Sequence, residues 1–309
     1  MKHLIETFLE MYNSENTKRR YKAVLLGFSE FVGGNLLETT VEDVFEYHDK
    51  LKKRDGIEPR LGGSRKLSGR TLKNTFEIIN SFFNHAVKRG RIKFNPVERA
   101  DVRLPHIEHN EKRATQIVDF DEVMTVCNGP SRHTKRGIRD RAILACLFGG
   151  GLRKSEVIKL NLADVMVNKK GLYLLLRNTK SGKTQTQALP DWASERVTRL
   201  LEVRKSEKAE AKDSLVVNYR THKEYPVNKP MPISTFDEIF YKWRNQAGIS
   251  SYISPHSARA TAISQLLALK IPIRDVQIFA RHESVRTTEQ YDKRYLGYGK
   301  EVAEKLSYN

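Results

Sequence analysis

Apolar positions recur with helical spacing through the first third of the chain. Between residues 16 and 31 the large apolar side chains stand three or four positions apart: Tyr21, Val24, Leu25, Phe28 and Phe31. This spacing puts them on one face of a helix with 3.6 residues per turn. Gly33 and Gly34 follow and stop the pattern. The pattern predicts an amphipathic helix over residues 16–31.

Two more helices are predicted in the same third. Thr40 precedes the segment VEDVFEYHDKLKKR and, with Asp43 three residues on, resembles a capping box that starts a helix. A stretch rich in glycine and charge, residues 55–69, interrupts the pattern. Apolar residues then return at helical spacing, and Gly90 stops them: Leu72, Phe76, Ile79, Phe83 and Val87.

The periodicity disappears between Pro96 and about Thr115, where Pro105 and charged residues of both signs stand. A segment of this composition is typical of a connection between domains. We therefore predict a helical domain over residues 1–100, a linker over 101–115 and a second domain over 116–309.

The second domain mixes helix and strand. Residues 140–148 are strongly apolar and predict a helix, while residues 171–176 and 185–189 predict two strands on either side of a turn at 181–182. Further helices are expected to begin near Trp192, Ile233, His256 and Pro272. The predicted fold class is mainly α with a small antiparallel β-sheet, in a helical N-terminal domain and an α+β second domain.

Charge narrows the class of partner. The 309 residues include 55 Lys and Arg against 37 Asp and Glu, a formal net charge of +18. A field of that sign attracts polyanions, which favours nucleic acid and leaves an anionic membrane surface as the rival. No apolar run approaches the roughly 20 residues that span a bilayer. We expect no membrane insertion.

Cysteine usage indicates a reducing compartment. Cys127 and Cys146 both stand in apolar helical patterns, and no Cys/His group has the spacing of a zinc site. The first residues, MKHLIETFLEMYNSEN, are interrupted by charges, unlike a signal peptide. We expect a cytoplasmic protein with buried thiols and neither a metal nor another cofactor.

Two segments place basic side chains where a phosphate could bind. In GGGLRKSE, three glycines end a helix and Arg153 stands at the start of the next, where backbone N–H groups favour anions. In SPHSAR, Ser254 and Pro255 start a helix, and His256 and Arg259 follow three residues apart on one face. Each segment alone is equally compatible with an ordinary capped helix.

Two further segments carry candidate chemistry. His282 and Tyr291 are nine residues apart, which on one straight helix would put them on opposite sides. A break is needed to bring both to one phosphate, and residues 283–288 are polar enough to provide it. In the predicted hairpin, Lys180 or Lys183 could reach into a cleft.

The order and spacing of these segments resemble the tyrosine recombinase (phage integrase) family, from about Thr115 to the end. The matching positions are Arg153 in GLRKSE with the acidic Glu156, Lys180 in TKSG, His256 and Arg259 in HSAR, His282 in ARH, and Tyr291 nine residues beyond His282. The N-terminal third is similar in pattern and position to the family's core-binding domain, which completes a clamp around DNA. Arg281 departs from the glycine that commonly precedes the family's histidine, and Asp292-Lys293-Arg294 follows the tyrosine.

The resemblance implies a mechanism. Tyr291 would attack a DNA phosphate and form a 3′-phosphotyrosine, with Arg153, Arg259 and the histidines stabilising the charge. His256 would be the base, Lys180 the acid, and Glu156 would orient the others. The implied partner is double-stranded DNA with inverted half-sites, bound by a homotetramer. A short amphipathic helix is predicted in the tail over KEVAEKLS, with Val302 and Leu306 on one side. It would dock on its own domain or, as the resemblance implies, on a neighbouring protomer.

Two rival functions stay open on the sequence. A type IB topoisomerase uses similar chemistry but reseals the same strand, and a DNA-binding relative without catalysis would keep the fold alone. The sequence does not distinguish integration, excision and resolution.

Overall fold

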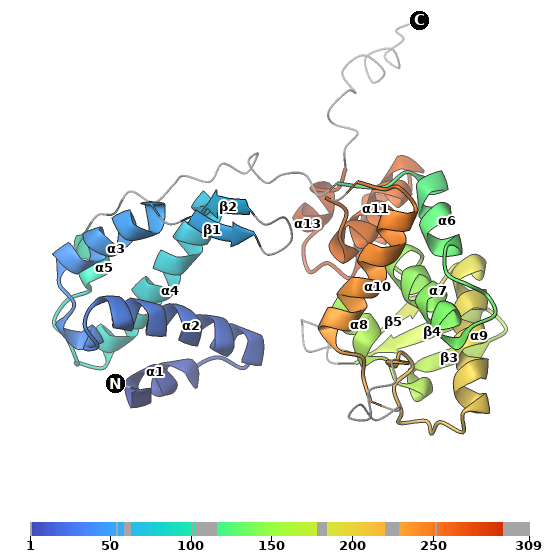
Figure 1. The fold of residues 1–309 in the computed structure, drawn as a ribbon, viewed down its shortest axis with the longest axis horizontal. Coiled ribbons are helices and arrows are strands. Elements are labelled where there is room, and N and C mark those ends of the chain that lie inside the picture. The colour runs from blue at the N-terminus through green and yellow to red at the C-terminus, as the bar shows by residue number, and fades with distance from the viewer. Residues whose placement is uncertain are drawn as a thin grey trace, which may run out of the picture. The chain divides into compact units, whose positions relative to one another are not determined.

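The computed structural model describes residues 2–53, 55–58, 63–100, 102, 116–177, 184–219, 229–250 and 252–292. The chain divides into two compact units, an N-terminal unit of residues 1–112 and a C-terminal unit of residues 113–309 (Figure 1). Each unit has its own hydrophobic core, as expected when the apolar stripes of several helices must be covered.

The N-terminal unit is helical. Its elements are α1 (Lys2–Leu9), α2 (Glu15–Phe31), the 3₁₀ helix η1 (Leu36–Glu38), α3 (Val41–Lys53), strands β1 (Asp55–Glu58) and β2 (Gly63–Lys66), α4 (Gly69–Lys88) and α5 (Pro96–Arg99). Phenylalanines at the predicted helical spacing fill the core, including Phe28 on α2 and Phe76 and Phe83 on α4. Phe28 packs edge-on against Phe83 with 6.1 Å between ring centroids.

The three helices predicted here are confirmed, and so is the start of α3. The Thr40 hydroxyl accepts from the Asp43 N–H at 3.1 Å, while the Asp43 carboxylate accepts from the Thr40 N–H at 2.8 Å. The stretch 55–69 differs from the expectation, because β1 and β2 pair there as an antiparallel hairpin.

The periodicity is lost at Pro96, but the chain is still helical there, before the predicted linker at 101–115. Pro96–Arg99 form the short helix α5, which the Asn95 side chain caps by accepting from the Val97 N–H at 2.9 Å. Pro96 and Ala100 are buried, and Ala100 belongs to the core of the N-terminal unit. A helix of one turn is too short to show an apolar periodicity. The capping residue Asn95 and the proline at the first helical position, Pro96, were the sequence signals for it.

The C-terminal unit combines helices with one small sheet (Figure 1). Its elements are α6 (Phe120–Asn128), α7 (Lys135–Phe148), α8 (Lys154–Lys159), the 3₁₀ helix η3 (Leu162–Asp164), β3 (Val165–Asn168), β4 (Gly171–Leu176), β5 (Gln185–Ala188), α9 (Asp191–Ser206), α10 (Ile233–Gln246), α11 (Pro255–Ala268), α12 (Ile273–Ala280) and α13 (Val285–Glu289). The predicted fold class, mainly α with a small antiparallel sheet, is confirmed.

The sheet is antiparallel in the order β3-β4-β5. Along β4, alternate residues Leu172, Leu174 and Leu176 are buried, as a strand with one covered face requires. Leu174 pairs with Gln187 of β5, which is also buried. The sequence did not predict β3, because three of its four residues are exposed and show no apolar alternation.

Helix α7 runs through the middle of the C-terminal core. Every residue from Gly137 to Phe148 is buried, so the charged pair Arg139 and Asp140 must be satisfied inside the protein. Their side chains bond at 2.7 Å, and the Trp243 indole N–H donates to Asp140 at 2.9 Å. The predicted start at residue 140 was too late, because the helix begins with the exposed Lys135 and Arg136, which carry no apolar pattern.

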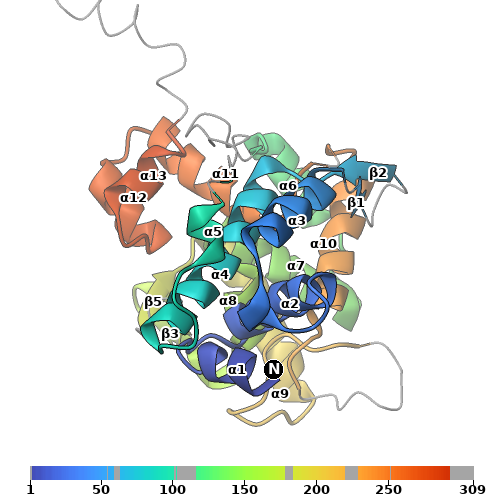
Figure 2. The same ribbon diagram turned by 90° about the vertical axis from the view of Figure 1, so that its left-hand side faces the viewer.

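Helices α11, α12 and α13 lie side by side in the C-terminal unit (Figures 1 and 2). Ile263 and Leu267 of α11 and Val276 and Ala280 of α12 form a small separate core, and Tyr291 packs against it. This core fixes the segment that carries Tyr291.

The two thiols are buried, as expected from the sequence. Cys127 and Cys146 are both buried and free, and burial raises the pKa of each thiol to about 12. Across the described ranges, no helix is both long and apolar enough to cross a membrane.

Candidate active site

The turn Gly149-Gly150-Gly151 delivers Arg153 to the start of α8. Gly151 has φ +56°, and a Cβ at that position would lie 3.0 Å from a ring carbon of Phe279. A glycine therefore serves both the left-handed backbone and the close approach of α12. Arg153 is the N-cap of α8, as the sequence indicated.

Arg153 is bound to Glu156 at two points. Its backbone N–H donates to Glu156 Oε2 at 2.7 Å, and its guanidinium Nη1 donates to Glu156 Oε1 at 2.7 Å. The N-cap amide is thus already occupied by a carboxylate. What remains for an anion is the outer part of the Arg153 side chain, which is 30% exposed.

His256 and Arg259 stand on the first turns of α11, as predicted. Ser254 caps the helix and Pro255 is its first residue. The His256 side chain is exposed, whereas Arg259 is almost fully buried. Arg259 donates to the backbone carbonyl of Gly151 at 2.6 Å and to that of Ala280, which leaves three of its five N–H donors for other partners.

The break between His282 and Tyr291 starts earlier than predicted. Helix α12 ends at Ala280, and Arg281 adopts the left-handed conformation with φ 54° and ψ 46°. Residues 283 and 284 bend, and α13 then occupies most of the segment expected to be irregular. The two rings meet in a stacked arrangement, with 5.7 Å between their centroids.

Tyr291 is held by its backbone and faces a histidine. Its carbonyl accepts from the Ser264 hydroxyl at 3.0 Å, and its hydroxyl lies 3.4 Å from His256 Nε2. Burial raises the pKa of Tyr291, and the charges of Arg259 and Arg153 oppose that rise without cancelling it. At neutral pH the phenol keeps its proton and needs an acceptor to become a nucleophile.

Desolvation and neighbouring positive charge keep both histidines neutral. Burial, followed by Arg259, Arg153, Arg281 and His256, lowers the pKa of His282 to about 4. Although the His256 side chain is exposed, desolvation by neighbouring protein atoms and the same two arginines, Arg259 and Arg153, also lower its pKa. His282 Nδ1 is 2.9 Å from the hydroxyl of the buried Thr288, which fixes the ring and leaves Nε2 for another partner.

Two groups in this centre were not selected from the sequence as site residues. Arg281 was noted there only as a departure from glycine, yet its guanidinium donates to Glu156 at 2.9 Å and to Gln187 of β5. Thr288 holds His282. A charged residue at a position that favours glycine was the signal for Arg281, whereas nothing in the sequence distinguished Thr288 from its neighbours.

Residues 178–183, which contain both candidate lysines Lys180 and Lys183, lie outside the described residues. The same holds for residues 293–309, which contain Tyr295 and the predicted tail helix. The described residues therefore bring together Arg153, Glu156, His256, Arg259, His282 and Tyr291 from α8, α11, and the turns around α12 and α13.

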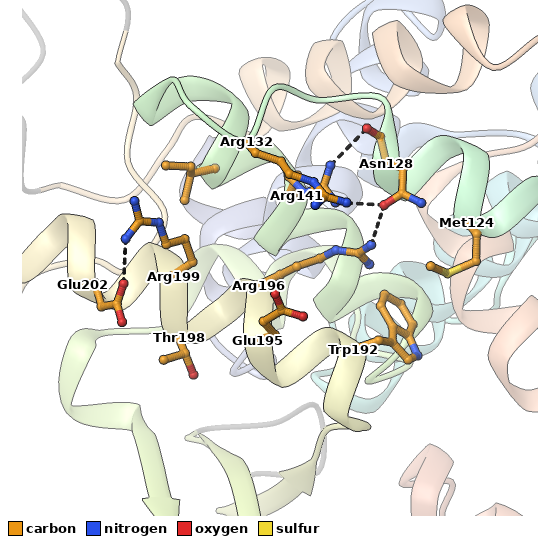
Figure 3. Close-up of a pocket in the computed structure, with 11 residues that line it drawn as sticks. Met124, Asn128, Arg132, Arg141, Trp192, Glu195, Arg196, Thr198, Arg199 and Glu202 are labelled. Carbon is orange, nitrogen blue, oxygen red and sulfur yellow. Dashed lines mark hydrogen bonds and ion pairs between the residues drawn. The ribbon is translucent and has the colours of Figure 1, made fainter.

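A pocket of about 620 Å³ lies elsewhere in the unit, between α6, α7 and α9 (Figure 3). Arg141 and Arg196 both donate to the Asn128 side chain there, and Arg141 also donates to the Asn128 and Pro130 carbonyls at the end of α6. Those bonds tie the end of α6 to α7 and α9. None of the six residues gathered around Tyr291 lines this pocket.

Family comparison agrees with the resemblance. The sequence model described as the phage integrase family matches residues 114–295, and that of the phage integrase SAM-like domain matches residues 2–102. The first of these covers more than half of the chain and spans the whole candidate site. The chain belongs to the phage integrase family.

Curated relatives named tyrosine recombinase XerC align along most of the chain. The protein of Roseiflexus castenholzii is 25% identical over 305 residues, which are 94% of this chain and 88% of the relative. That of Pelobacter propionicus is 28% identical over 279 residues, 90% of this chain and 84% of the relative.

Solved structures share the fold. A Tn1549 transposon integrase in complex with a circular intermediate DNA aligns with a TM-score of 0.70 at 16% identity, covering 99% of this chain and 98% of that one. A lambda integrase dimer bound to a COC′ core site aligns with a TM-score of 0.66 at 14% identity, covering 94% of each chain.

The charge around His282 predicts its titration. A histidine whose pKa is lowered to about 4 in the folded protein binds fewer protons than the unfolded chain between about pH 4 and 6.5. Its neutral state thus stabilises the fold above pH 6.5, and that contribution is lost as the pH falls toward 4. Ring ¹⁵N NMR should show His282 neutral at pH 6, with His282→Asn identifying its signals. A midpoint near 6.5 would contradict this environment.

Proposed function

We propose that this member of the phage integrase family is a site-specific DNA recombinase that cleaves and rejoins strands through Tyr291. The observation that carries the proposal is the Tyr291 hydroxyl 3.4 Å from His256 Nε2, within the field of Arg153 and Arg259. A phenol, a neutral imidazole and two guanidiniums are the groups that phosphoryl transfer to tyrosine requires.

Tyr291 is the proposed nucleophile and His256 the proposed base. The phenol of Tyr291 is protonated because burial raises its pKa, and His256 is neutral because its pKa is lowered. A neutral Nε2 at 3.4 Å can accept the phenol proton, since catalytic hydrogen bonds are often long before substrate binds. The oxygen of Tyr291 then bonds to phosphorus while the bond to the 5′-oxygen breaks.

The arginines and His282 would stabilise the charge that collects on the phosphate. Arg153 has a partly exposed guanidinium, and Arg259 keeps three N–H donors beyond its two carbonyl partners. His282, neutral and oriented by Thr288, can donate from Nε2. Donors fixed before the substrate arrives need no reorganisation during the reaction, which is the condition for strong electrostatic catalysis.

The departing 5′-oxygen needs a proton, and Lys180 is the proposed donor, with Lys183 as the competing residue. The products are a 3′-phosphotyrosine and a free 5′-hydroxyl. Attack by the 5′-hydroxyl of another strand reverses the chemistry and releases Tyr291. The phosphoester bond is conserved at each step, so this sequence of steps consumes no ATP.

The proposed substrate is double-stranded DNA. The net charge of +18 favours a polyanion, and two integrases of the same fold were solved with DNA bound. We propose that the N-terminal unit, which matches the SAM-like domain, contacts the duplex together with the C-terminal unit. Residues 1–100 would then be the core-binding domain, and residues 116–309 the catalytic domain.

We further propose assembly as a homotetramer on two sites with inverted half-sites. Strand exchange needs two cut duplexes, hence one nucleophile for each of four strands. The predicted tail helix, KEVAEKLS, is too short to be stable alone and would dock on a neighbouring protomer. Integration, excision and resolution all use this assembly, so the biological role of the reaction depends on the sites that it joins.

Removing one oxygen tests the nucleophile. Tyr291→Phe should abolish the covalent protein–DNA adduct on a nicked cognate site and leave DNA affinity within about twofold, because the ring and the basic surface remain. The adduct is detected by denaturing gel electrophoresis. An adduct formed by the phenylalanine variant would identify another residue, such as Tyr295, as the nucleophile. Relaxation of supercoiled plasmid lacking the site would instead favour a topoisomerase.

Arg153→Ala should separate cleavage from binding. Removal of one transition-state donor costs about 2.7–4 kcal/mol, or roughly 10²- to 10³-fold in rate. We expect that loss in single-turnover cleavage with little change in affinity. Lys154→Ala is the matched control, since Lys154 is the next residue and pairs with Asp237 outside the site. Equal losses in binding and cleavage would make Arg153 an ordinary backbone contact.

Binding should depend steeply on salt. Each neutralised phosphate releases counterions, so log K should fall by about 0.9 per contact for each log unit of salt. Fluorescence anisotropy with a labelled duplex between about 50 and 200 mM salt measures the slope. A flat response would argue against a protein that contacts many phosphates.

A further inference from the structure

Arg281 occupies a backbone conformation that favours glycine. Its φ of 54° is in the left-handed region, where it closes α12. The Arg281 N–H donates to the Ile278 carbonyl at 3.0 Å, and the next amide, that of His282, donates to Gln277 at 3.1 Å. Glycine would make this turn without strain, so the side chain of Arg281 must contribute something that offsets the strain.

The side chain of Arg281 is buried, at 2% exposure, and reaches several elements at once. Nη2 donates to Glu156 Oε2 on α8 at 2.9 Å and, more weakly, to the Gly151 carbonyl at 3.4 Å. Nη1 donates to Gln187 Oε1 on β5 and to the Phe279 carbonyl at 3.2 Å. One guanidinium therefore joins the turn before α8, Glu156 on α8, the edge strand β5 and the end of α12.

Glu156 is shared between two arginines. Its Oε1 accepts from the Arg153 guanidinium, while its Oε2 accepts from Arg281 and from the Arg153 backbone. A carboxylate with both oxygens available can bind one guanidinium with two parallel bonds. Because Arg281 donates to Oε2, the Arg153 guanidinium donates to Glu156 through Nη1 only. Its other N–H groups remain for another acceptor.

We propose that Arg281 is a positioning residue for DNA cleavage, which acts through Glu156 to aim the Arg153 guanidinium at the scissile phosphate. The proposal rests on the proposed function of the site. Arg281 itself does not reach the substrate, because its side chain is enclosed and its bonds go to protein acceptors. Through Gln187 it also anchors the strand that directly follows the segment of Lys180.

The alternative is a purely structural role, in which Arg281 only closes the end of α12. The two roles predict different effects of the Arg281→Gly substitution on cleavage. Arg281→Gly suits the left-handed backbone and removes the guanidinium, so a purely structural role predicts unchanged cleavage. The positioning role predicts that, in this variant, both oxygens of Glu156 accept from the Arg153 guanidinium. Arg153 then has fewer donors for the phosphate, and cleavage slows.

The decisive measurement is single-turnover cleavage of a nicked cognate site beside DNA affinity. For Arg281→Gly we expect cleavage at least tenfold slower, affinity within about twofold and a lower melting temperature, with the protein still folded at the assay temperature. Arg281→Lys keeps the positive charge but not the planar set of guanidinium donors, so it should restore only part of the rate. Lys270→Gly is the matched control, because Lys270 also has positive φ, 61°, but is exposed at the end of α11.

The pH profile adds a readout that a structural role would not move. Burial alone would raise the pKa of Glu156, but Arg281 first, and then the bonds from Arg153, hold it below its usual value. In Arg281→Gly the acidic limb of cleavage should move to higher pH, since protonating Glu156 breaks its bond to Arg153. The other charged groups facing it, Arg153 and Arg259, are unchanged in that variant. Because Arg281 also lowers the pKa of His282, the same substitution is tested in a Glu156→Gln background, in which a shift caused by Glu156 disappears.

Two outcomes would overturn the proposal: wild-type cleavage by Arg281→Gly, or parallel losses of cleavage and affinity. A double-mutant cycle with Glu156→Gln should be non-additive, because both residues act on Arg153. Failure of the proposed function is distinguishable, since unmodified protein would then form no adduct at all. In that case ¹³C NMR of the Glu156 carboxyl still tests the contact, and an unchanged Glu156 titration in Arg281→Gly would refute it.

Discussion

The candidate site depends on one carboxylate surrounded by guanidiniums. Glu156 bonds directly to Arg153 and Arg281, and the charge of Arg259 acts on it from α11. The Gly151 carbonyl gives a second common point, since it accepts from both Arg259 and Arg281. These two acceptors hold four segments together: the glycine turn, the start of α8, helix α11 and the end of α12.

The centre carries excess positive charge, because one carboxylate, Glu156, faces three arginines. Like charges so close are unfavourable, and burial with the neighbouring Arg153 and Arg281 lowers the pKa of Arg259 to about 9. An arriving phosphate would relieve that repulsion. Stability is therefore given up in the free protein at the place where we propose that the DNA phosphate binds, which is common at functional sites.

The sequence predicts the fold where one apolar face decides the structure. Helices α2 and α4 and strand β4 followed their periodicities, whereas β3 is too exposed and α5 too short to show one. The order of the site residues came from resemblance to a family, because each segment alone also fits an ordinary cap or surface. The contact of Arg281 with Gln187 joins residues 94 positions apart, and only the folded chain brings them together.

Phosphate binding has a further consequence for the proposed base. His256 is kept neutral partly by repulsion from Arg259 and Arg153, which makes it a weak proton acceptor in the free protein. A bound phosphate cancels part of that repulsion, so the pKa of His256 must rise toward its ordinary value. The same cancellation weakens the help that both arginines give to ionisation of Tyr291. In the proposed mechanism, activation of Tyr291 then depends more on His256, which becomes a better base once the DNA phosphate is in place.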